Sequence, residues 1–184
     1  MRALSISEAS FFDTPGENGY PETMTENIHA RWSLGIFAPP LAIGTPAPPF
    51  NMLDNTGALV SSDHLLGKKP FVLVFYPADF TAVCTAQLCA LRDQYQTFAD
   101  RGIEVFGVNP FNWDTHRKFA AQHRFPFRIL FDPHCKYANR YHAVLIPSFI
   151  NKRLVYGVGT DGTICFAKGG KPPVSDILKA FSTT

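Results

Sequence analysis

The sequence of 184 residues lacks any apolar run of about 18 residues, so it predicts no membrane-spanning helix. It also lacks an excess of charge, because 17 basic and 15 acidic residues give a formal net charge of +2. A dedicated nucleic-acid-binding domain carries a basic excess, so this balance argues against a nucleic acid as partner. Apolar residues still make up 46% of the chain, enough to bury a core, which excludes wholesale disorder.

Cysteine is scarce as well, with four residues in the chain: Cys84, Cys89, Cys135 and Cys165. Four cysteines in a chain of this length are too few for a disulfide scaffold, so we expect reduced thiols. Metal binding and thiol chemistry remain as their possible uses. The sequence contains no Cys-x-x-Cys pair, which a thioredoxin-type oxidoreductase would show.

The beginning of the chain lacks the apolar segment of a secretory signal. Its five acidic residues within 1–40 also differ from an Arg-rich, acid-poor transit peptide, so the expected location is the cytoplasm. Residues 1–40 carry a net charge of −3 and residues 41–184 a net charge of +5. Because 1–40 show no sustained periodicity, we interpret them as an N-terminal extension of unknown role, followed by a single domain over 41–184.

Strand and helix patterns alternate along this domain. Residues 71–76 form an uninterrupted apolar run (FVLVFY), typical of a central strand buried on both faces. Spacings of three to five residues between apolar positions predict a helix over 81–99. Further strands are expected at 103–108 and 128–131, further helices at 112–123, 136–141 and 174–181, and hairpins at 50–60 and 153–167. This order predicts an α/β, thioredoxin-like fold: a mixed, largely parallel sheet flanked by helices, with an N-terminal β-hairpin.

The chemically informative segment is 76–89, which leaves the buried strand, turns at Pro77 and enters the first long helix. Thr81 is predicted as the N-cap of this helix, which makes Cys84 about its third residue. Backbone N–H groups there have no helical partner and the helix dipole is positive, so a thiolate is favoured. The sequence therefore predicts Cys84 as an activated thiol.

Two other interpretations of the cysteines are open. Cys84 and Cys89 are also compatible with small buried residues on a core helix. A zinc site from Cys84, Cys89, His134 and Cys135 has an unusual spacing, because His134 and Cys135 are adjacent instead of one turn apart. We therefore predict no metal and no bound cofactor.

Pro77, Thr81 and Cys84 resemble the Pro-x-x-x-Thr/Ser-x-x-Cys signature of the peroxiredoxins. The surrounding segment is similar to the subgroup called bacterioferritin comigratory protein, or Q-type; it reads FVLVFYPADFTAVCTAQLCALRD. In that subgroup a second cysteine follows the first by five residues, as Cys89 does here. The similarity covers about residues 43–181, and 1–40 have no counterpart in it.

The resemblance implies a role for each matching residue. Cys84 is the peroxidatic cysteine, whose thiolate attacks a peroxide oxygen and becomes a sulfenic acid. The hydroxyl of Thr81 holds the peroxide and the thiolate, and Pro77 shields the pocket from water. Arg153, which precedes the Asp-Gly turn of the second hairpin, stabilises the thiolate and polarises the peroxide. Cys89 is the resolving cysteine.

Other residues near the motif have weaker assignments. Gln87 is expected to support Arg153, and Asn109 stands where the family commonly has a serine. Cys135 and Cys165 match no role in the family; they are expected to be bystanders, with a resolving role for either as the alternative. The remaining basic candidates for the site are expected to be solvated surface residues: Arg128, Arg140 and Lys152.

Helix geometry adds a constraint on the cysteine pair. Residues five apart in an ideal helix have Cα atoms roughly 8.7 Å apart, whereas a disulfide needs about 4.4–6.8 Å. We therefore hypothesise that the start of the helix unwinds before Cys84 and Cys89 join.

The resemblance as a whole implies a thiol peroxidase for hydrogen peroxide or organic hydroperoxides. It further implies thioredoxin or a similar dithiol as reductant, and a monomer or weak dimer. The alternative is a non-enzymatic redox sensor or partner-binding module that uses the same cysteine pair.

Overall fold

The computed structural model describes residues 38–146 and 149–182, so the predicted extension lies outside the described residues except for its last three. A seven-stranded sheet has the order β2-β1-β5-β4-β3-β8-β9. Its strands are β1 (Asn51–Asp54), β2 (Leu59–Ser61), β3 (Phe71–Phe75), β4 (Glu104–Asn109), β5 (Arg128–Phe131), β8 (Leu154–Val158) and β9 (Ile164–Gly169). A second, two-stranded sheet pairs β6 (Val144–Ile146) with β7 (Ile150–Asn151) and was not predicted from the sequence.

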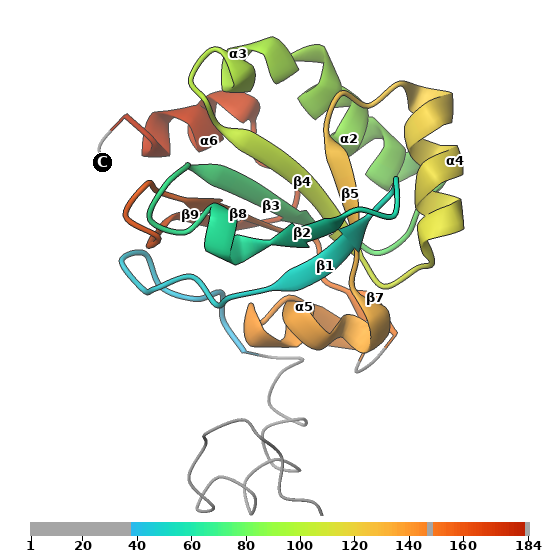
Figure 1. Ribbon diagram of the computed structural model, residues 1–184, viewed down its shortest axis with the longest axis horizontal. Coiled ribbons are helices and arrows are strands. Elements are labelled where there is room, and N and C mark those ends of the chain that lie inside the picture. The colour runs from blue at the N-terminus through green and yellow to red at the C-terminus, as the bar shows by residue number, and fades with distance from the viewer. Residues whose placement is uncertain (1–37, 147–148, 183–184) are drawn as a thin grey trace, which may run out of the picture.

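Helices cover both faces of the large sheet. They are α2 (Ala82–Asp93), α3 (Tyr95–Ala99), α4 (Trp113–His123), α5 (Lys136–Arg140) and α6 (Val174–Ala180), with short 3-10 helices at Ser62–His64 and Pro133–Cys135. Figure 1 shows α2, α3, α4 and α6 on one side of the sheet and α5 on the other. The helix predicted over 81–99 is divided at Gln94, where φ is −114° and ψ is 12°.

The thioredoxin-like α/β architecture and the mixed sheet match the prediction, but the expectation of a largely parallel sheet was wrong. Among the strands that the structure describes, only the pairs β3–β4 and β4–β5 are parallel. The pairs β1–β2, β1–β5, β3–β8 and β8–β9 are antiparallel. The parallel neighbours are joined by helical connections, from β3 to β4 through α2 and α3 and from β4 to β5 through α4, whereas the hairpins β1–β2 and β8–β9 add antiparallel strands.

The burial of strand β3 explains why polar and apolar residues do not alternate in its sequence. All five of its residues are buried, because both faces of the sheet are covered. Phe71, Leu73 and Phe75 belong to the core on the α5 side. Val72 and Val74 belong to the core under α2 and α6, which also contains Cys84.

Two large apolar residues in the first turns of α2 and α4 are exposed. Val83, in the first turn of α2, is 50% exposed, and Trp113, at the start of α4, is 43% exposed. The guanidinium of Arg117 lies 5.3 Å from the centre of the Trp113 ring, one turn along the same helix. Spacing alone does not show where the first turn of a helix leaves the core.

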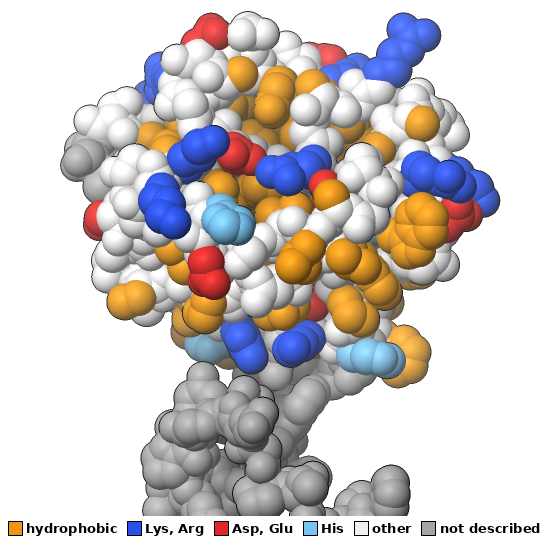
Figure 2. Space-filling model, in the orientation of Figure 1, with side chains coloured by type: hydrophobic (Ala, Val, Ile, Leu, Met, Phe, Trp, Pro, Cys, Tyr) orange, Lys and Arg blue, Asp and Glu red, His pale blue; other side chains and the backbone are white. Residues whose placement is uncertain are grey.

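The surface reflects the even charge balance. On the face seen in Figure 2, basic side chains form separated groups with acidic and apolar ones between them. Within the described part of the chain, no helix has the length and apolar character needed to cross a membrane.

Candidate active site

The loop between β3 and α2 positions the predicted reactive cysteine. Phe80 has a φ of 59°, in the left-handed region, and its ring packs against Phe119 with centroids 4.9 Å apart. This turn places Thr81 at the N-cap of α2 in extended conformation, so Cys84 is the third helical residue, as predicted. The Thr81 hydroxyl does not cap the helix; it donates to the Ala78 carbonyl at 3.3 Å.

Cys84 and Arg153 come together although they are 69 residues apart in the chain. The Cys84 side chain is buried, with 1% of the residue exposed, and Arg153 donates from Nη2 to its sulfur at 3.2 Å. Arg153 also donates from Nη1 to Oε1 of Gln87 at 2.5 Å. Gln87 in turn donates from Nε2 to the Gly170 carbonyl at 3.4 Å, so the expected support of Arg153 by Gln87 is confirmed.

This arrangement surrounds one sulfur with positive electrostatic potential. The unpaired N–H groups of the first turn of α2 and the guanidinium of Arg153 both favour a negative charge on Cys84. Charges in a buried site interact more strongly than they would in water. The site can therefore hold a thiolate and stabilise further negative charge that develops next to it.

Pro77 and Thr81 lie in the same loop, but their predicted roles stay predictions. Pro77 is half-buried and directly follows the buried Tyr76. Within the described residues, no hydrogen bond joins the Thr81 hydroxyl to the Cys84 sulfur.

The other basic candidates have partners elsewhere. Arg128 pairs with Glu104 at 2.8 Å, Arg140 donates to the Pro49 carbonyl at 3.3 Å, and Lys152 donates to the Ala38 carbonyl at 3.1 Å. The choice of Arg153 among the basic residues is therefore supported by geometry.

Cys89 lies five residues after Cys84 on the same unbroken helix, and both are free thiols. Its sulfur is 4.0 Å from Nδ1 of His123, the last residue of α4. Sequence reasoning missed His123, because its contact with Cys89 joins positions 34 residues apart.

A buried polar network beneath the loop was also missed. Asp79 accepts from the Tyr76 hydroxyl and from Asn109 Nδ2, both at 2.7 Å, and its other oxygen lies 2.7 Å from Nδ1 of His116. Burial acts to raise the pKa of Asp79, but His116 and the other two partners lower it below its ordinary value. Asn109, whose role was undefined in the sequence, thus helps to fix the loop that carries Pro77 and Thr81.

The remaining cysteines lie in less favourable surroundings for a thiolate. Burial, with a smaller effect from the Asp132 charge, raises the pKa of Cys135 to about 12. Burial also raises the pKa of Cys165 to about 11, and Asp161 adds to this effect. The candidate zinc ligands do not come together, since Cys84 and Cys135 belong to the cores on opposite faces of the sheet.

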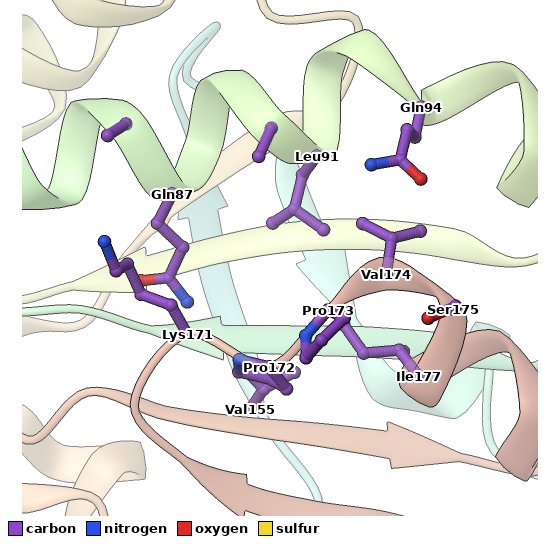
Figure 3. A pocket seen from close by; sticks show the side chains of 12 residues that line it. Gln87, Leu91, Gln94, Val155, Lys171, Pro172, Pro173, Val174, Ser175 and Ile177 are labelled. Carbon is purple, nitrogen blue, oxygen red and sulfur yellow. The ribbon is translucent and has the colours of Figure 1, made fainter.

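A groove of about 430 Å³ lies between α2 and the beginning of α6. Figure 3 shows Gln87 and Lys171 at one end of it, with Leu91, Val174 and Ile177 further along. The groove is lined by Gln87, which contacts Arg153, and Cys84 is not one of its lining residues.

Comparison with known proteins identifies the family. The AhpC/TSA family model matches residues 43–167. Peroxiredoxin Q, chloroplastic, of Sedum lineare is 43% identical over 132 residues, 72% of this chain and 63% of the relative. The chloroplastic peroxiredoxin Q of Arabidopsis thaliana is 43% identical over 126 residues, 68% of this chain and 56% of the relative. The chain thus spans less than two thirds of the length of these curated relatives.

Solved structures agree with this result. The peroxidoxin BcpB of Mycobacterium tuberculosis has a TM-score of 0.69 and 26% identity, over 78% of this chain and 96% of that one. Peroxiredoxin Q of Xanthomonas campestris has a TM-score of 0.64 over 73% of this chain and 88% of that one; at 16% identity this shows the fold alone. Since the family model covers more than half of the residues and includes Cys84, Cys89 and Arg153, the chain belongs to the AhpC/TSA family and is a member of its peroxiredoxin Q, or bacterioferritin comigratory protein, type.

Proposed function

We propose that the chain is a thiol peroxidase that reduces hydrogen peroxide or organic hydroperoxides with Cys84. The observation that carries this proposal is the guanidinium of Arg153, 3.2 Å from the Cys84 sulfur at the first turn of α2. A structural cysteine in a core has no need of a cation at its sulfur. Family membership supports the same chemistry.

The first step is attack of the Cys84 thiolate on one peroxide oxygen. The O–O bond breaks, the sulfur is oxidised to a sulfenic acid, and the other oxygen leaves as water or an alcohol after taking up a proton. Arg153 stabilises the thiolate before the reaction and the negative charge on the leaving oxygen during it. Thr81 and Pro77 complete the pocket in this proposal, the first by holding the peroxide and the second by excluding water.

Cys89 resolves the sulfenic acid as an intrachain disulfide. Because α2 is continuous from Ala82 to Asp93, the two sulfurs cannot bond until the first turn of the helix opens. The first turn has features that make opening inexpensive in free energy: its N-cap side chain forms no capping hydrogen bond, and Val83 is exposed.

A dithiol, thioredoxin or a similar protein, then reduces the disulfide, with the chain acting as a monomer or weak dimer. The acidic composition of residues 1–40 supports the cytoplasm as its location, whereas the relatives of Sedum lineare and Arabidopsis thaliana are named chloroplastic. Fractionation of cells that express the chain distinguishes the two locations.

Peroxide consumption in the presence of thioredoxin, thioredoxin reductase and a nicotinamide donor tests the proposal. The native chain should turn over, Cys84→Ser should be inactive, and Cys89→Ser should consume about one equivalent and stop. Mass spectrometry after one equivalent should show the Cys84–Cys89 disulfide. Turnover by Cys84→Ser would refute the proposal, and one equivalent without turnover in the native chain would instead support a redox sensor.

A further inference from the structure

Cys89 has a neighbour that neither the motif nor family membership assigns. Its sulfur lies 4.0 Å from Nδ1 of His123, and both residues are half-buried at the contact between α2 and α4. Among the described residues, the His123 side chain makes no other hydrogen bond. The imidazole is therefore directed at the thiol that the proposed function names as resolving.

The orientation of the imidazole is fixed by packing. Its ring stacks on Phe125, with centroids 5.6 Å apart and planes at 22°, and meets Phe119 edge-on at 5.0 Å. Arg92, one turn after Cys89, donates from Nη1 to the His123 carbonyl at 2.8 Å. Two ring contacts and one hydrogen bond to its backbone carbonyl thus hold His123 beside Cys89.

The charged groups around this contact are few. Arg92, on the same helix as Cys89, is paired with Asp93 at 2.8 Å, and its charge interacts with Cys89. On the side of α4, the groups packed against the ring are the aromatic side chains of Phe119 and Phe125. In residues 38–146 and 149–182, no carboxylate lies within ion-pair distance of the His123 ring.

The position of Cys89 explains why a base is needed. A thiolate, not a thiol, attacks sulfur. Cys84 lies in the first turn of α2, next to the half-buried guanidinium of Arg153, but Cys89 is the eighth residue of the helix, where the N–H groups are already paired. Imidazole takes up protons near neutral pH, and its Nδ1 accepts from the thiol when Nε2 carries the ring proton.

We propose that His123 is a catalytic residue of the resolving step and accepts the proton of Cys89. This inference rests on the proposed function. As the proton moves to Nδ1, the Cys89 sulfur attacks the Cys84 sulfenic sulfur, the S–S bond forms and the S–O bond breaks. The hydroxide leaves and becomes water by taking up a proton, so that one sulfenic acid and one thiol yield one disulfide and one water.

The same contacts suit the required opening of α2. His123 and Arg92 hold the part of the helix that carries Cys89 against the end of α4. Among the residues that the structure describes, no hydrogen bond joins the first turn, with Cys84, to α4, and the contacts of that region with α4 come from Asp79 and Phe80 in the loop before it. Opening is thus confined to the segment before Cys89, which keeps its base while Cys84 moves towards it.

Single-turnover kinetics of His123→Asn test the proposal, with one equivalent of hydrogen peroxide and acid quench before mass spectrometry. Sulfenic acid should form at Cys84 at the native rate, and the disulfide should form about 10²-fold more slowly at pH 7. The deficit should shrink as pH rises, because hydroxide then deprotonates Cys89. Added imidazole should restore much of the rate in His123→Ala, a rescue that a merely structural role would not allow.

A measurement without peroxide separates this inference from the proposed function. In a Cys84→Ser background, His123→Asn should lower the rate at which iodoacetamide alkylates Cys89 near neutral pH. His64→Asn, an exposed histidine of the 3-10 helix after β2, is the matched control and should change neither rate. Equal alkylation of Cys89 with and without His123 overturns this inference, whereas absence of a Cys84 sulfenic acid in the native chain overturns the proposed function.

Discussion

Cys84 and Cys135 occupy similar positions but have opposite electrostatic surroundings. Each is 1% exposed, and each lies at the amino-terminal end of a helix, Cys84 as the third residue of α2 and Cys135 as the N-cap of α5. The guanidinium of Arg153 lies 3.2 Å from the Cys84 sulfur, while Cys135 follows the carboxylate of Asp132. Burial and that carboxylate raise the pKa of Cys135 to about 12, so it stays a thiol at physiological pH.

The two helix ends differ in what already occupies them. Asp132 accepts hydrogen bonds from the backbone N–H groups of Tyr137 at 2.9 Å and Ala138 at 2.7 Å, so its carboxylate uses the positive end of α5. At α2, the N-cap Thr81 directs its hydroxyl to the Ala78 carbonyl and does not cap the N–H groups of the first turn. Cys84 therefore has both a helix end that no carboxylate occupies and a cation near its sulfur, and Cys135 has neither.

Arg153→Gln should have the largest effect on the peroxidase reaction, because it removes the positive charge that Cys84 has beside it and Cys135 lacks. We expect the second-order rate constant for peroxide reduction to fall about 10²–10³-fold, as when one charge-stabilising donor is lost from an active site. Stopped-flow measurement of sulfenic acid formation provides the rate. Arg128→Gln, which removes the partner of Glu104 in β4, is the matched control and should react at the native rate. A native rate in Arg153→Gln would show that the helix end alone activates Cys84.

Asp132→Asn tests the carboxylate at the Cys135 site by its effect on the free energy of unfolding. Burial raises the pKa of Asp132 to about 6 in the folded chain, against its backbone hydrogen bonds, from an ordinary value of 3.8. Between these two pKa values the folded state holds a proton that the unfolded state has lost. The free energy of unfolding should therefore fall by on the order of 3 kcal/mol as pH rises from about 4 to about 6. In Asp132→Asn this fall should be absent from urea unfolding curves. An equal fall in the variant would mean that another group is responsible.

Much of the scaffold follows from local sequence. The run from Phe71 to Phe75, the turn at Pro77 and the cap position of Thr81 determine where β3 ends and α2 begins, and these are local effects. They placed Cys84 correctly at the third helical residue. The parallel fraction of the sheet was overestimated because alternating strand and helix patterns do not show how the flanking hairpins attach.

The rest of the site depends on contacts between distant parts of the chain. The pairs Asp79–His116 and Cys89–His123 join residues 37 and 34 positions apart, and no local pattern distinguishes these histidines from ordinary helical ones. Arg153 was found by its place relative to a family motif, and its contact with Gln87 could be anticipated only in that way. Asp132 was missed because capping from a residue outside the helix has no simple spacing.

The smallest effect is expected from removing both cysteines outside α2. The sheet separates Cys135 from Cys84, since they belong to different cores. Cys165 is the unpaired extra residue of a bulge in β9, next to the pair that Val158 forms with Ile164. Val158 and Arg153 are five residues apart in the chain, about 16 Å along an extended strand. Its pKa of about 11, raised mainly by burial, also keeps it a thiol near neutral pH.

Cys135→Ala combined with Cys165→Ser should therefore retain native turnover in the thioredoxin-coupled assay and form the Cys84–Cys89 disulfide in full. Loss of turnover would assign a resolving role to one of these thiols, and the two single variants would then show which one, because only its removal would stop the reaction after one equivalent of peroxide.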